Sequence, residues 1–157
     1  MSTKISTLID SMRSIIDTAL PDHLEVINPY FPEESDDLTL KKCWGLALRS
    51  GVNSNREQNC RYSMVQNIEL LIARTAFSGH IRTATAIQER IDVEKLLMED
   101  RHLVVSNFEN SPQINSNDIA RCEFLNDGGI EFVRIDESDI LMIKMNFEVE
   151  YFESLTS

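Results

Sequence analysis

The segment that most constrains the fold of this chain runs from Ile140 to Phe152, where apolar and polar side chains alternate. The odd positions are apolar, namely Leu141, Ile143, Met145, Phe147, Val149 and Tyr151. Between them lie Lys144, Asn146, Glu148 and Glu150. Because successive side chains of a strand point to opposite sides, this pattern predicts a β-strand with one face on a core and the other in water.

The predicted strand is unusually long. At about 3.3 Å per residue it spans about 40 Å, whereas an ordinary strand has about 5–6 residues. A small domain rarely needs such a strand for its own core. We therefore expect the sheet to reach beyond the monomer.

Composition limits the class of protein. With 157 residues, 42% of them hydrophobic and 26% charged, we expect one globular domain over residues 1–157. The sequence has no apolar run near the roughly 20 residues of a membrane span. The first residues lack the apolar stretch of a secretory signal, so we expect the chain to stay in the cytoplasm where it is made, away from membranes.

The net charge of −11 argues against nucleic-acid binding. Proteins that hold DNA neutralise its phosphates with Lys and Arg, and this chain has 26 acidic residues against 15 basic ones. Such a protein can still surround DNA without holding it.

No pattern of reactive residues points to an enzyme. The cysteines and histidines are scattered singly, at Cys43, Cys60, Cys122, His23, His80 and His102. They form no metal-ligand spacing, and the sequence has no nucleophile or phosphate-binding glycine motif. We expect no catalytic residue, no metal and no cofactor.

Two helices are expected beside the β-structure. Residues 2–20 carry an apolar stripe at spacings of three and four, and Pro21 ends it. A second helix is expected over residues 86–108, with Ile87, Ile91 and Leu97 among the apolar residues of its one buried side.

Two β regions complete the pattern. A hairpin is expected over residues 40–75, with a protruding polar loop at residues 50–59. C-terminal β-structure is expected over residues 118–152, with a hairpin turn at Asp127-Gly128, whose register the sequence leaves open. The order predicts an α+β fold, with an antiparallel or mixed sheet that has a long C-terminal strand and is packed by two main helices.

Two stretches resemble the tail terminator and head-tail neck proteins of tailed bacteriophages. One is the strand from Asp139 to Phe152, with its aliphatic start and F-x-V-x-Y ending; the other is Arg74 to Phe108, which contains VEKLLMEDRHLVVSNF. Members of this group are small acidic α+β proteins. The resemblance implies a structural virion protein, first present in the host cytoplasm and then in the tail or neck of the virion.

The resemblance also implies partners. It predicts a homo-oligomer, a hexameric ring that caps the tail tube, ends its polymerisation and joins the tail to the head. The partners would be the tail tube protein and a neck or head-completion protein. DNA would pass through an acidic lumen without specific binding, since like charges repel.

Two segments are candidates for contacts in such an assembly. The first is the predicted loop of Gly51, Val52, Asn53, Ser54, Asn55, Arg56 and Glu57. The second is an acidic patch at a lumen or on the surface, formed by Glu33, Glu34, Asp36 and Asp37. An ordinary hairpin loop and a solvated charge run are the alternatives for these two segments.

Two other functions remain open. One is a neighbouring neck or connector ring, which the sequence does not distinguish from a tail terminator. The other is a cytoplasmic adaptor that binds partners by β-augmentation along the long strand.

Overall fold

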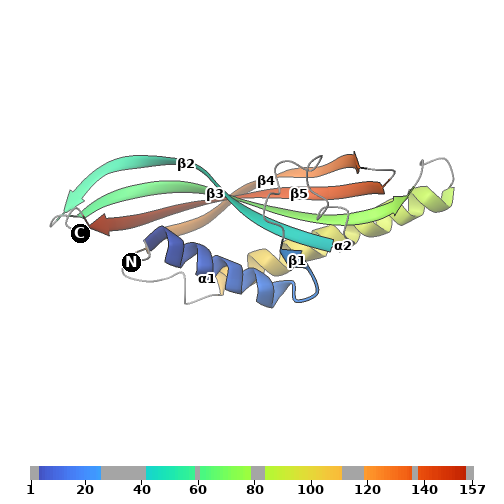
Figure 1. The fold of residues 1–157 in the computed structure, drawn as a ribbon, viewed down its shortest axis with the longest axis horizontal. Helices are drawn as coiled ribbons and strands as arrows, with labels where there is room; N and C mark the ends of the chain where they lie inside the picture. Colours follow the sequence, from blue (N-terminus) through green and yellow to red (C-terminus); the bar gives the residue numbers. More distant parts are fainter. Residues whose placement is uncertain are drawn as a thin grey trace.

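The computed structural model describes residues 4–25, 42–58, 61–78, 84–110, 119–135 and 138–154, which form two helices and one five-stranded sheet (Figure 1). The elements are α1 (Lys4–Ala19), β1 (Leu24–Glu25), β2 (Lys42–Gln58), β3 (Arg61–Ser78), α2 (Ala84–Glu109), β4 (Ile119–Ile135) and β5 (Ser138–Ser154). The two predicted helices are confirmed to within two residues at each end.

The sheet is mixed, in the order β1-β2-β3-β5-β4. The short β1 pairs with β2 in parallel, and every other neighbouring pair is antiparallel. The strands are long and twist strongly near their middle (Figure 1). The predicted α+β class, with two helices packed on a mixed sheet, is confirmed.

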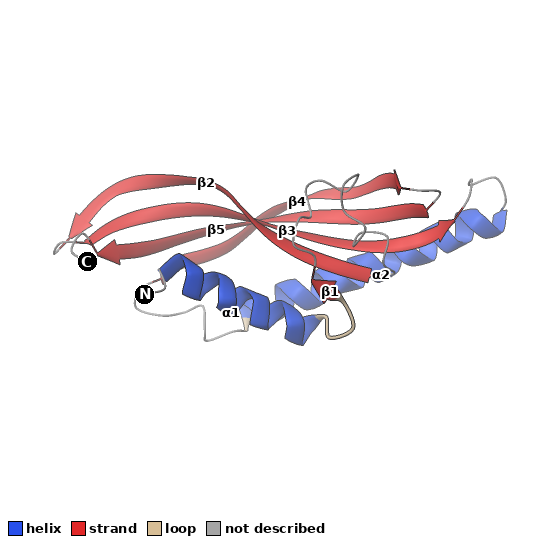
Figure 2. Cartoon of the chain, viewed as in Figure 1, coloured by secondary structure: helices blue, strands red, loops and turns tan. Residues whose placement is uncertain are grey.

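Both helices cover the same face of the sheet (Figure 2). The core lies between them and this face, and it includes the stripe of α1 from Leu8 to Leu20 and the predicted apolar side of β5 from Leu141 to Tyr151. At its centre Phe147 stacks on Phe108 of α2, with ring centroids 4.7 Å apart. Phe124 of β4 lies 5.6 Å from the same ring. On this face the prediction is confirmed, because the apolar side chains at the odd positions of β5 are buried.

The opposite face of β5 is less exposed to water than predicted. A second apolar cluster forms there from Cys43, Leu71, Ala73, Ile140 and Met142, all buried. The side chains of Lys144, Asn146 and Glu148 are only half-buried, and Glu150 is 6% exposed. Alternation predicts which side chains of a strand share a face. Whether the second face is also covered depends on tertiary packing.

The predicted protruding loop at residues 50–59 is wrong. Gly51 to Gln58 continue β2, which pairs with β3 from Lys42↔Arg74 to Gln58↔Arg61. The register shifts after Leu48 and after Asn53, so the glycine- and Asn-rich composition produces irregularities within the strand. A polar stretch still pairs as a strand when a neighbour of equal length satisfies its backbone groups.

The predicted hairpin turn at Asp127-Gly128 is also wrong. β4 is one strand across this point, and its partners change from Asp127↔Met145 to Ile130↔Ile143. Two residues of β4 therefore oppose one of β5, which is a β-bulge. Gly129 has φ of 78°, a backbone conformation that favours glycine. The turn-forming residues therefore lie in a bulge within one strand. The hairpin formed by β4 and β5 closes at Ile135 and Ser138, which pair with each other.

Candidate functional site

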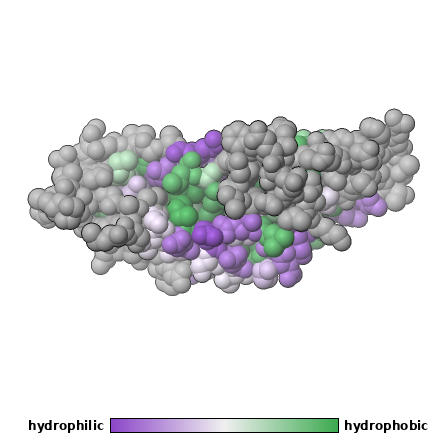
Figure 3. Space-filling view, in the orientation of Figure 1, coloured by the Kyte–Doolittle hydropathy of each residue, from purple (hydrophilic) through white to green (hydrophobic). Residues whose placement is uncertain are grey.

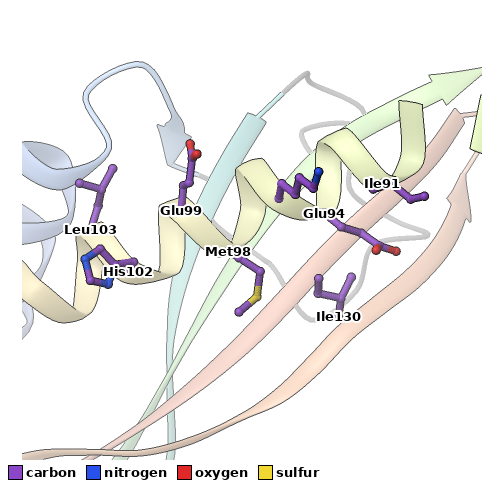
Figure 4. Close-up of a pocket in the computed structure, with 8 residues that line it drawn as sticks. Ile91, Glu94, Met98, Glu99, His102, Leu103 and Ile130 are labelled. Atoms are coloured by element: carbon purple, nitrogen blue, oxygen red, sulfur yellow. The ribbon is translucent and has the colours of Figure 1, made fainter. Parts of the chain in front are cut away.

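An open groove runs between the outer side of α2 and the edge strand β4. Its volume is about 690 Å³. The lining residues are Ile91, Glu94, Lys95, Met98, Glu99, His102 and Leu103 of α2, with Ile130 of β4. Met98 extends from α2 on the side of the helix where Ile130 of β4 lies (Figure 4). The groove is therefore apolar at its floor and carries charged groups at its rim.

Several apolar side chains near this groove are exposed. We call the exposed Ile87, Ile91, Met98 and Phe132, together with the half-buried Ile130, the apolar strip. Met98 is 45% exposed and Phe132 is 43% exposed. The cause is the position of α2, which packs mainly over β3 and β5, so that the side of the helix toward β4 reaches past the core.

Two arginines hold α2 above β4. The guanidinium of Arg90 lies 5.1 Å from the ring centroid of Phe132, and that of Arg101 lies 5.1 Å from the centroid of Phe124. The Nε of Arg90 also donates a hydrogen bond to Oε1 of Glu94, one helical turn later, at 3.2 Å. Such cation–π contacts contribute about 0.5–1 kcal/mol each at exposed sites. They fix the width of the groove.

A buried polar network anchors the other side of α2. The Asp100 carboxylate accepts hydrogen bonds from Arg74 Nε at 2.7 Å and from a terminal guanidinium nitrogen at 2.9 Å. His23 Nε2 lies 3.1 Å from Asp100 Oδ2, and both side chains are almost fully buried. The network therefore ties the connection after α1, strand β3 and helix α2 together.

The charge state of Asp100 follows from these partners. Burial alone raises the pKa of this carboxyl, but the hydrogen bonds from Arg74 and His23, with the charges of both groups, bring the pKa below its ordinary value. Asp100 is thus a carboxylate at neutral pH, and it holds the helix that forms one wall of the groove.

The sheet has two long edges without a partner strand in the part of the chain that the structure describes. β4 pairs only with β5, and β2 pairs with β1 only at Cys43 and Trp44. Unpaired edges present rows of N–H and C=O groups that can pair with another chain.

On one face of the molecule, apolar side chains also gather near its middle between hydrophilic ones (Figure 3).

The sequence-predicted contact residues fall partly outside this surface. Gly51 to Glu57 lie in β2, at one sheet edge, instead of in a loop. Glu33, Glu34, Asp36 and Asp37 lie outside the described residues. The assembly roles of both segments stay predictions.

Sequence reasoning missed the apolar strip and the Arg74–Asp100 pair. It placed Ile87 and Ile91 on the buried side of the second helix, but both are exposed, while Leu97 is buried. On a helix of 3.6 residues per turn, Ile91 and Met98 share a face that Leu97 does not share. The seven-residue spacing of Ile91 and Met98 could have predicted a second apolar face on this helix.

The described residues give no sign of a metal centre or a membrane span. They contain no group of three or more His, Cys, Asp and Glu side chains placed to hold a metal ion. Neither helix in the described ranges is long and apolar enough to cross a bilayer. They form an α+β fold in which the edge strand β4 lies beside an apolar groove. No protein-family model matches the chain, and no curated protein matches it either.

Proposed function

We propose that this chain is a structural subunit of a homo-oligomeric ring, and specifically a hexameric tail terminator or neck ring of a tailed bacteriophage. The observation that carries the proposal is the pair of long sheet edges β2 and β4, on opposite sides of one sheet, which have no partner strand over most of their length among the described residues. Different surfaces on opposite sides of a subunit suit head-to-tail contacts, which close into rings.

The exposed apolar side chains of α2 support this proposal. Ile87, Ile91 and Met98 leave apolar area in water, which a partner surface would cover. The charge of −11 supports a ring around DNA, since an acidic lumen would not retain the polymer. β5 contains Asp139 to Phe152 and α2 contains VEKLLMEDRHLVVSNF, the stretches that carry the resemblance stated above.

The mass of the native particle tests the ring. Native mass spectrometry over a range of concentrations should give a hexamer, or a monomer that becomes hexameric on tubes polymerised from the tail tube protein of the same phage genome. Electron microscopy should then show rings at tube ends. A monomer or dimer that never associates with tubes would contradict the proposal.

The second candidate is an adaptor that binds an extended peptide along β4. The same unpaired edge supports it, because added strands gain affinity from backbone hydrogen bonds. An adaptor would remain monomeric and bind a peptide with apolar residues at alternate positions, whereas a ring subunit would bind its own copies.

A further inference from the structure

We infer that the groove between α2 and β4 receives strand β2 of a second copy of this chain, which continues the sheet beyond β4. The inference rests on the proposed function for the presence of further copies. It adds which two surfaces meet and which side chains fill the groove.

Strand direction is compatible with this contact. From β2 onward all neighbours are antiparallel, so β4 runs opposite to β2. A rotation about an axis parallel to the strands keeps β2 in one direction in every copy. The β2 of the next copy is then antiparallel to β4, and both strands have 17 residues. The sheet would continue with the pairing that it already uses.

Side-chain parity directs apolar groups of β2 into the groove. Leu46 pairs with Leu70 and Leu48 with Ile68, which places both leucines on the helix-covered face of the sheet. Leu48 is 52% exposed in the monomer. In a continued sheet this face of β2 lies on the same side as α2 of the neighbouring copy. Leu48 would then lie beneath the helix, against Met98 and Ile130.

The two surfaces are complementary in charge. β2 has three basic residues, Lys42, Arg49 and Arg56, against one acid, Glu57, in a chain that is strongly acidic as a whole. Within the monomer Lys42 lies 3.9 Å from Asp22 and Arg49 lies 3.1 Å from Glu69. The groove is lined by two acidic residues, Glu94 and Glu99, against one basic residue, Lys95, and β4 has three acidic residues against two basic ones. Attraction between a positive strand and a negative groove favours β2 over another acidic segment as the occupant.

The proposed contact has two different surfaces, and it can be tested with two variants that each disrupt one of them. Met98→Lys places a charge in the groove, and Leu48→Lys places one on the inserted strand. Both positions are about half exposed, so the monomer should keep its melting temperature. The matched control is Leu96→Lys, on the same helix and 41% exposed, but outside the groove.

Each variant alone should fail to form rings in native mass spectrometry, while Leu96→Lys assembles like the wild type. An equimolar mixture of the two defective variants should give a heterodimer and nothing larger, because one intact groove and one intact strand remain. A ring that forms despite both substitutions overturns the inference and leaves the proposed function standing. Loss of rings in Met98→Lys alone, with Leu48→Lys normal, also overturns it, since the groove would then hold a different segment. A wild type that stays monomeric both in solution and with tail tubes overturns both.

Discussion

Asp100 of α2 accepts two hydrogen bonds from Arg74 of β3, at 2.7 and 2.9 Å, and this pair fixes the helix that forms one wall of the groove. The two residues come from different elements and lie 26 positions apart in the chain. His23 completes the network from the connection after α1. The groove therefore depends on a buried charge pair that lies behind it.

Removing the carboxylate should destabilise the fold. Asp100→Ala leaves Arg74 partly buried without its partner, which should cost about 3 kcal/mol in the free energy of unfolding. Urea denaturation at neutral pH measures this. The double variant Arg74→Met with Asp100→Leu should recover much of the loss, because an apolar pair of similar volume needs no desolvation. A loss below about 0.5 kcal/mol in Asp100→Ala, the level of an ordinary surface substitution, would contradict the role of the pair.

The same carboxyl should make stability depend on acid pH. The pKa of Asp100 is lower in the folded chain than its ordinary value, so its contribution is present above about pH 4 and is lost as the pH falls through the folded value. The difference in unfolding free energy between wild type and Asp100→Asn should therefore shrink from about pH 4 downward. Parallel curves for the two proteins would show that Asp100 does not titrate differently on folding.

The centre of the core should tolerate little change. Phe147 is 1% exposed and contacts the rings of Phe108 and Phe124, so Phe147→Ala should cost about 3–5 kcal/mol. Chemical denaturation measures the loss. Phe132→Ala is the control, since its ring is 43% exposed and its removal should cost much less. Equal losses at the two positions would contradict the difference in burial between the two rings.

Gly129 tests the bulge in β4. Its φ of 78° is unfavourable for an L side chain, and a Cβ there would meet nothing within 4 Å. Gly129→Ala should therefore cost about 1 kcal/mol from backbone strain alone. Gly129→Asn should cost less, because Asn adopts this conformation more readily. A larger loss for Asn than for Ala in thermal denaturation would show that space, and not φ, limits this position.

Hydrogen exchange should locate the contact between copies. In a monomer, amides of β3 and β5 are flanked by strands on both sides and should exchange slowly. In the assembled ring, β4 and the part of β2 beyond Trp44 should gain protection while α1 stays unchanged. Gains confined to α1 would place the interface elsewhere.

The local pattern of the sequence determined the elements whose character depends on near neighbours. The stripe of α1, the alternation of β5 and the class of fold all follow from spacing, because helical and strand periodicity assign side chains to faces. The second helix was also predicted, within two residues of Ala84–Glu109.

Only the tertiary structure decided what depends on partners distant in sequence. Gly51 to Glu57 became a strand because β3 pairs with them, and Asp127-Gly128 became part of a bulge because β5 continues past them. The exposure of Met98 and the burial of Asp100 depend on where α2 lies over the sheet. Local propensity is a weak preference that a long paired neighbour overrides, and a groove exists only once two elements are placed together.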